Sequence, residues 1–478
     1  MSNSKNAIPE NGIYDARKLG VPKMLILGLQ HLFAMFGATV LVPLLTGLSV
    51  SSTLLFAGLG TLFFHLVTGG KVPAFLGSSF AFLGGYGAIT ALADENMSKA
   101  QLLPYACLGV ACAGLVYLIL AALIQFVGVN KVMRYFPPVV TGPIIISIGL
   151  GLAGSAVNNC QTNWLVALIA LAIIVIFNVW GRGMAKIVPI LLGVLGSCAI
   201  AAILAVCFGK PVIVNDAEYI AIAGKENLLL FSSAALEQLK SAAWIGLPFK
   251  WQDTVFAIDW SNSSLIISSI VAIVPISLAT MMEHIGDISA ISSTVGKNFI
   301  ANPGLHRTLL GDGLATTFAS LFGAPANTTY GENTGVLALS KVYDPRVIRI
   351  AAVFAAVLSF CPKFAAIVNL IPTAVIGGIS FVLYGMISAI GVRNVVENKV
   401  DFTKSRNLIV AAIILVCALG LGSVSFSIGG VGITLSALAV ASIAGIVLNA
   451  ILPGKDYEFG RDESGDQAVD FQINSSKK

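Results

Sequence analysis

Long apolar runs recur along nearly the whole chain and constrain its fold more than any other feature. An apolar run of about 20 residues crosses the bilayer core as a helix, because a helix satisfies its own backbone hydrogen bonds. We therefore predict an all-α polytopic membrane protein with about 14 transmembrane segments. The runs are residues 23–46, 52–68, 74–92, 100–128, 136–157, 163–180, 186–208, 264–290, 306–323, 326–340, 347–361, 366–391, 406–421 and 430–452.

The composition agrees with this class and excludes others. Hydrophobic residues make up 56% of the chain and charged residues only 11%, against about 25% charged in ordinary soluble domains. A membrane β-barrel would show short alternating segments instead of long apolar runs. The net charge of +5 fits basic cytoplasmic loops and gives no indication of nucleic-acid binding. The seven cysteines lack the spacing of zinc, haem or redox motifs, so we expect no metal and no cofactor.

A polar segment divides the chain into two halves. Residues 209–263 carry mixed charge and several aromatic residues, which is typical of a water-exposed or interfacial linker. This linker separates seven apolar runs in residues 22–208 from seven in residues 264–453. Basic residues cluster in alternate loops and in the tails, 1–21 and 454–478. By the positive-inside rule, we predict that both termini are cytoplasmic and that the linker is extracellular.

One apolar segment is interrupted by residues that an unbroken membrane helix avoids. Residues 324–335 contain a proline, two glycines, two asparagines and Glu332. A proline removes a backbone N–H, and a carboxylate at the bilayer centre costs about 2.5–3.5 kcal/mol. We predict an extended piece over residues 325–330 that leads into a half-helix starting near Gly331, whose N–H groups face a ligand. The alternative is a short extracellular loop.

The two halves carry matching motifs in the same order. A second break is predicted around residues 73–88. Gln30-His31 in the first segment is echoed by Glu283-His284 in the eighth, and Ser79-Phe80 in the third by Thr329-Tyr330 in the tenth. Seven segments per half make the halves enter the membrane from opposite sides, so we predict an inverted repeat. Paired broken segments in matching halves indicate a substrate site at the membrane midplane.

Three acidic residues are expected at membrane depth, namely Glu283, Asp287 and Glu332. Glu283 and Asp287 are four residues apart and therefore share one helix face. Two carboxylates this close do not both ionise easily, which suits proton coupling by Asp287, by Glu283 or by both. In the structural alternative, Asp287 only braces a neighbouring helix and Glu283 alone is functional.

Several neighbouring residues are candidates for supporting the site. His31 is expected to support it by packing, whereas His284 is either a ligand or a packing histidine. Asn333 either holds Glu332 in place or touches the substrate. The backbone N–H of Phe80 is expected at the second break. The supporting candidates are Gln30, His31, Ser79, His284 and Asn333.

Five sequence motifs, taken together, are specific enough to indicate a protein family. They are residues 30–43 (QHLFAMFGATVLVP), 77–82 (GSSFAF), 283–287 (EHIGD), 302–307 (NPGLHR) and 328–335 (TTYGENTG). They resemble the nucleobase–ascorbate transporter family, in particular its bacterial uracil permeases, over nearly the whole chain except the termini and the linker. The resemblance implies a core domain (segments 1–4 and 8–11) and a gate domain (segments 5–7 and 12–14). It also implies extended pieces in segments 3 and 10, a homodimer, and a place in the plasma (inner) membrane of a bacterium.

The same resemblance implies a proton-coupled symporter that imports uracil by alternating access. Glu283 and Glu332 would bind the pyrimidine ring, and the backbone N–H groups of Phe80 and Gly331 would bind its carbonyls. The chemistry agrees, because uracil offers two N–H donors and two carbonyl acceptors. By the resemblance, the pocket is lined by Tyr330 and Tyr384.

Two positions depart from the family pattern. Asp287 stands where the enterobacterial uracil permease has a histidine, which leaves the proton carrier open, and Ser340 replaces a usual threonine. Purine-transporting relatives more often have glutamine where Glu332 stands, which favours uracil. The alternatives are a purine or xanthine permease of this family, or an anion transporter or channel of similar fold. No enzyme is expected, because the chain has no catalytic or metal-ligating motif such as His-Glu-x-x-His.

Overall fold

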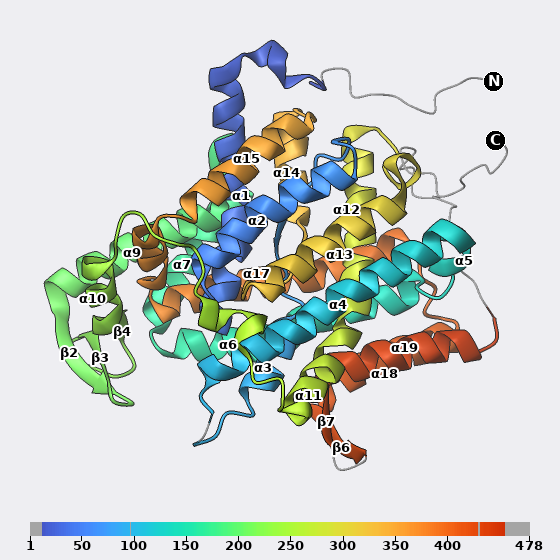
Figure 1. Ribbon diagram of the computed structural model, residues 1–478. Coiled ribbons are helices and arrows are strands. Elements are labelled where there is room, and N and C mark those ends of the chain that lie inside the picture. Colours follow the sequence, from blue (N-terminus) through green and yellow to red (C-terminus); the bar gives the residue numbers. More distant parts are fainter. Residues whose placement is uncertain (1–11, 96, 429–430, 455–478) are drawn as a thin grey trace.

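The protein is described by a computed structural model that covers residues 12–95, 97–428 and 431–454. Figure 1 shows a body of packed helices with small groups of strands. The helices are α1 (Val21–Thr46), α2 (Val50–Val67), α3 (Leu83–Thr90), α4 (Lys99–Val127), α5 (Val129–Met133), α6 (Pro138–Gln161), α7 (Trp164–Val179), α8 (Met184–Ile187), α9 (Pro189–Phe208), α10 (Ser233–Ser241), α11 (Ser263–Ile273), α12 (Ser277–Val295), α13 (Leu305–Leu321), α14 (Gly331–Ser340), α15 (Pro345–Leu358), α16 (Pro362–Asn369), α17 (Thr373–Glu397), α18 (Ser405–Gly420) and α19 (Ala437–Ile451).

The strands form three separate antiparallel groups. The first joins two distant parts of the chain, the second lies in the predicted linker, and the third is a hairpin before the last helix. They are β1 (Leu76–Ser78) with β5 (Asn327–Thr329); β2 (Gly209–Val214), β3 (Ala217–Ile222) and β4 (Leu229–Ser232); and β6 (Ser423–Ile428) with β7 (Val431–Ser436).

Many of the helices have the length and composition of membrane spans. Within the described residues, seven are long and apolar enough to cross a membrane, or eight if α15 and α16, bent by 89°, form one span. The helices α7, α18 and α19 are shorter but also apolar. Large apolar side chains such as Phe126 (87% exposed) and Val206 (89%) lie on outer faces, as expected of helices that lipid surrounds. These findings confirm a mostly helical, multi-pass membrane protein.

Two expectations about the runs need correction. The 430–452 run is not helical throughout, since β-branched residues favour a strand in its first part and α19 begins only at Ala437. The 366–391 run contains a helix break, because Pro372 cannot continue α16 into α17. Within the 209–263 segment, three strands form a sheet against which α10 packs. Figure 1 shows this unit, in green, at one end of the molecule.

The predicted extended pieces in segments 3 and 10 are confirmed as β1 and β5. They pair antiparallel, with Leu76 opposite Thr329, Gly77 opposite Thr328 and Ser78 opposite Asn327. The helices α1, α2, α12 and α13 all pack against this strand pair. Two short pieces of extended backbone are therefore enclosed by helices, where the protein itself must satisfy their hydrogen bonds.

A short N-terminal segment ties together the ends of two helices that flank the strands. Ile13 N donates to Lys341 O at 2.8 Å, just beyond α14. The Tyr14 hydroxyl donates to Val295 O at 2.7 Å, at the end of α12. Asp15 accepts two hydrogen bonds from the Arg17 guanidinium, which lower the pKa of Asp15 well below its usual range. Arg346 Nη1, on α15, also donates to Asp15 Oδ1 at 3.1 Å, so the segment is held by charge as well as by backbone pairing.

Candidate functional site

The site is built where the two broken segments cross. The strand β1 is followed by Phe80 and then α3, while β5 is followed by Tyr330 and then α14, whose first residue is Gly331. Ser79 N donates to Ala326 O at 3.1 Å, and Tyr330 N donates to Phe75 O at 3.0 Å. The prediction of an extended piece leading into a half-helix at Gly331 is confirmed, and Phe80 lies at the second break as expected.

Side chains from the neighbouring helices hold these short strands. Thr61 Oγ1 on α2 accepts the N–H of Leu76 at 2.9 Å, and Thr316 Oγ1 on α13 donates to Asn327 O at 2.9 Å. Asn327 Nδ2 donates to Phe56 O on α2 at 2.7 Å. A three-residue strand pair has few ladder hydrogen bonds of its own. These contacts therefore fix the positions of the two breaks.

A fully buried carboxylate, Asp312 on α13, is central to this support. Its Oδ1 accepts the backbone N–H of Thr329 at 2.8 Å. Its Oδ2 lies 3.3 Å from His284 Nδ1, and that nitrogen is also 3.1 Å from Thr329 Oγ1. Asp312 and His284 thus connect α13 and α12 to β5. Of the two readings left open for His284, these contacts favour a structural one.

Asp312 was not among the acidic residues that the sequence analysis expected at membrane depth. It adds to those three a fourth acidic side chain, which is completely buried beside β5. A signal was present in the sequence. Asp312 stands between two glycines in the middle of the apolar run 306–323, and an ionisable residue in such a run is a functional candidate by default.

The helix α12 presents one of its two predicted carboxylates, that of Asp287, toward the start of α14. Glu283 and Asp287 are both half-buried and one turn apart. A methyl group built on Gly331 would lie 2.8 Å from Asp287 Oδ1, so this carboxylate lies against the N-terminus of α14. A helix N-terminus favours a negative charge beside it. The backbone of Glu332 belongs to the first turn of α14, whereas its side chain lies outside the described part of the structure.

Several buried polar atoms near the strand pair have no hydrogen-bond partner in the described structure. They include both ring nitrogens of His31, the hydroxyl of Ser79 and the side-chain amide of Asn333. Gln30, next to His31 on α1, is also buried. Since buried polar groups are nearly always paired, these unpaired ones are candidates for binding a polar ligand. These residues lie on α1, directly after β1 and on α14, and α1 packs on both β1 and α14.

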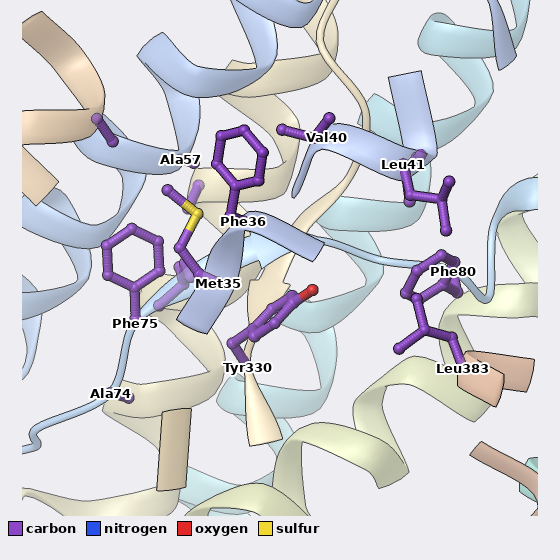
Figure 2. Packing of buried hydrophobic residues seen from close by; sticks show 14 of the residues in the cluster. Met35, Phe36, Val40, Leu41, Ala57, Ala74, Phe75, Phe80, Tyr330 and Leu383 are labelled. Carbon is purple, nitrogen blue, oxygen red and sulfur yellow. The ribbon is translucent and has the colours of Figure 1, made fainter. Parts of the chain in front are cut away.

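Aromatic rings cover both breaks. The Phe80 ring meets Tyr384, a buried residue on α17, edge to face at 5.9 Å. The Tyr330 ring covers Gly77 so closely that a methyl group there would lie 2.9 Å from Tyr330 Cδ2. Figure 2 shows Tyr330 within the packed side chains of this region and Phe80 beside Leu383 of α17. The structure therefore brings Phe80 and Tyr384 together and sets Tyr330 over β1.

Two broken segments that meet beside the buried carboxylate of Asp312 and the half-buried carboxylate of Asp287 indicate a membrane transporter. A family model named Xan_ur_permease and described as "Permease family" matches residues 22–426. The chain belongs to this family. The expectation that it is a transporter and not an enzyme is thereby confirmed, as is the family resemblance found in its motifs.

Relatives and solved structures agree with this assignment. The uracil permease of Bacillus subtilis is 39% identical over 438 residues, which cover 89% of this chain and 91% of the relative. The probable uracil permease of Haemophilus influenzae is 37% identical and covers 94% of this chain and 98% of its own length. The transmembrane domain of a cyanobacterium bicarbonate transporter, BicA, matches with a TM-score of 0.60 at 15% identity, over 91% of this chain and 99% of that domain. This last likeness shows the fold alone.

Proposed function

We propose that the protein is a proton-coupled symporter that imports uracil across the plasma (inner) membrane of a bacterium by alternating access. One observation carries the proposal. The half-helix that starts at Gly331 meets the carboxylate of Asp287, one turn from Glu283 on α12. Such a site presents backbone N–H donors and carboxylate acceptors side by side. The names of the relatives, uracil permeases in two cases, support the choice of substrate.

Uracil matches these groups, because it has two ring N–H donors and two carbonyl acceptors. Glu283 and Glu332 are proposed to accept the ring N–H groups. The backbone N–H groups of Phe80 and Gly331 are proposed to donate to the carbonyls, as the first turn of a helix leaves such groups without partners. The aromatic walls and the supporting polar groups are proposed to be Tyr330, Tyr384, Gln30, His31, Ser79 and Asn333.

The packing of the helices supports an inverted repeat of fourteen segments in residues 22–208 and 264–453. The helix α2 packs on α15, and α13, its counterpart in the second half, packs on α4. The pair α7 and α9 likewise matches α18 and α19. Segments 1–4 and 8–11 would form the core domain that moves against a gate domain of segments 5–7 and 12–14. The homodimer implied by the family resemblance stays a prediction, which the mass of the detergent-solubilised protein tests.

The orientation of the protein gives a first prediction. With both termini cytoplasmic, the 209–263 unit is extracellular. Glu237 is exposed on α10 of this unit. On a background without the seven native cysteines, Glu237→Cys should therefore react with a membrane-impermeant thiol reagent in intact cells. Reaction only after lysis would reverse the orientation.

The close approach of Asp287 to Gly331 gives a second prediction. A methyl group at Gly331 would sit 2.8 Å from Asp287 Oδ1 and force this carboxylate away from α14. We expect Gly331→Ala to lower uracil uptake at least tenfold, about 1.4 kcal/mol, with normal amounts of folded protein in the membrane. Gly335→Ala is the matched control, because a methyl group there meets nothing within 4 Å. Equal uptake by the two variants would remove this contact from the site.

Proton coupling by Asp287 gives a third prediction. A proton from outside would neutralise Asp287 and weaken its hold on the start of α14, where a substrate carbonyl could then bind. Asp287→Asn mimics the neutral form permanently. It should bind uracil and exchange labelled for unlabelled uracil, yet fail to accumulate uracil against a gradient. Normal accumulation with an unchanged pH dependence would instead assign the proton to Glu283, Glu332 or His31.

The remaining candidate function is a purine or xanthine permease of the same family. Uptake of labelled uracil into whole cells, with unlabelled uracil, xanthine and guanine as competitors, separates the two. We expect only uracil and close pyrimidine analogues to compete, and a protonophore to stop accumulation. Competition by xanthine or guanine at equal concentration would favour the purine carrier.

A further inference from the structure

A polar cavity lies outside the proposed uracil site. Its volume is about 130 Å³, about ten times the 10–15 Å³ that one water molecule needs. It opens between the first residues of α6 and α18, the loop after α17 and the end of α19. Figure 1 shows α18 and α19 side by side, in red. None of its lining residues belongs to the crossing strands or to α12 and α14.

The lining of this cavity is strongly basic. Four cationic side chains and one carboxylate contribute to it, namely Arg134, Lys399, Lys404, Arg406 and Asp401. The carboxylate is engaged locally, because Asp401 Oδ1 accepts from Thr403 N at 2.9 Å and from Thr403 Oγ1 at 2.6 Å. The balance of charge around the cavity therefore favours an anion.

Two helix N-termini add to this positive field. The helix α18 starts beside Lys404, and α6 starts at Pro138; neither N-cap residue makes a side-chain capping hydrogen bond. Residues of both first turns line the cavity. Each helix N-terminus carries about half a positive charge, and its first N–H groups have no partner within the helix. Phosphate groups bind at such places, and nearby cations strengthen the binding.

Arg406 has a donor, its Nε, that can bind an additional hydrogen-bond acceptor. Its Nη2 donates to the backbone and side-chain oxygens of Asn449, each at 2.8 Å, which fixes the guanidinium between α18 and α19. Its Nε is buried and has no hydrogen-bond partner among the described residues. A guanidinium held in this way loses little freedom on binding, and its planar fork matches the oxygens of a phosphate.

We propose that this cavity binds a phosphate group, and that the group belongs to the head of an anionic membrane lipid. The exposed residues Tyr135 and Phe402 directly follow the lining residues Arg134 and Asp401 in the chain, and aromatic residues are enriched at membrane surfaces. In the proposed orientation the cavity lies on the cytoplasmic side, where the leaflet carries anionic lipids. A bound head would link α6, α17, α18 and α19, all of which belong to the proposed gate domain.

The test uses the full-length protein in a mild detergent and compares its unfolding midpoint with phosphatidylglycerol, phosphatidylcholine or inorganic phosphate added. We expect phosphatidylglycerol to raise the midpoint by about 3 °C or more, since a ligand that binds only the folded state stabilises it. Phosphatidylcholine should not do so. If inorganic phosphate alone raised the unfolding midpoint as much as phosphatidylglycerol does, the cavity would be a phosphate site whose ligand is the free ion and not a lipid.

A variant pair makes the test specific to the cavity. Lys399→Gln combined with Lys404→Gln should lose most of the phosphatidylglycerol shift. Arg393→Gln is the control, because Arg393 lies at the same end of α17, outside the cavity, and pairs with Glu397 at 2.6 Å; it should keep the shift. If the double variant does not fold, Lys399→Gln alone is compared with the control. The proposal would be overturned if phosphatidylglycerol raised the unfolding midpoint of the cavity variant as much as that of the wild type. It would also be overturned if phosphatidylcholine raised the wild-type midpoint as much as phosphatidylglycerol does.

Discussion

Asp312→Ala should destabilise the protein by about 3 kcal/mol and eliminate uracil transport. The substitution removes the acceptor of the Thr329 backbone N–H and the neighbour of His284 Nδ1. A buried donor left without a partner costs about 1–3 kcal/mol, and the Thr329 N–H would lose its partner in this variant. Because β5 leads directly into α14, its displacement would also move the N–H groups at Gly331. The free energy of unfolding of the purified protein and uracil uptake in cells are the two measurements.

Asp312→Asn provides the matched control for this prediction. The amide keeps an oxygen that can accept from Thr329 N, so most of the loss in stability should be recovered. It removes the negative charge beside His284, so transport should recover only in part. Wild-type stability of Asp312→Ala would contradict the structural role assigned to this residue.

Glu283→Gln should reduce uracil uptake about 100-fold without unfolding the protein. The substitution keeps the size of the side chain but replaces a charged acceptor, and an amide group can turn its own N–H donors toward the ring. A hundredfold loss corresponds to about 2.8 kcal/mol, in the range of a hydrogen bond to a charged group. Uptake kinetics and the amount of protein in the membrane are measured together. The family resemblance gives the same expectation for Glu332→Gln.

Glu397→Gln serves as the control for this substitution. Glu397 is an exposed carboxylate that pairs with Arg393 at the end of α17, and pairs of this kind contribute little. It should transport normally. If Glu283→Gln and Glu397→Gln behaved alike, Glu283 would not contact the substrate.

The features that the sequence predicted well depend on local chemistry. Long apolar runs require helices in a bilayer, whatever packs around them. The breaks at β1 and β5 were predictable because proline, glycine and polar residues interrupt two such runs. The start of α14 at Gly331 followed from the same signal. The membrane-protein class and the positions of the two breaks could therefore be derived from the order of residues alone.

The features that were missed depend on contacts between distant segments. The role of Asp312 requires Thr329 and His284, which lie 17 and 28 residues away in the chain. The basic cavity joins Arg134 to Arg406 from opposite halves. The strand in the 430–452 run was hidden because an apolar run of β-branched residues is compatible with both a strand and a helix. Only the packed structure shows which residues meet.

Transport by the purified protein tests the central claim most directly. The full-length chain is reconstituted into liposomes with a pH gradient imposed across the membrane, and the entry of labelled uracil is followed. The proposed mechanism predicts that uracil accumulates above its external concentration when the outside is acidic, and that a protonophore releases it. Asp287→Asn should equilibrate uracil without accumulating it. If the wild-type protein only equilibrates uracil, or transports none under the same gradient, proton-coupled uracil transport is contradicted.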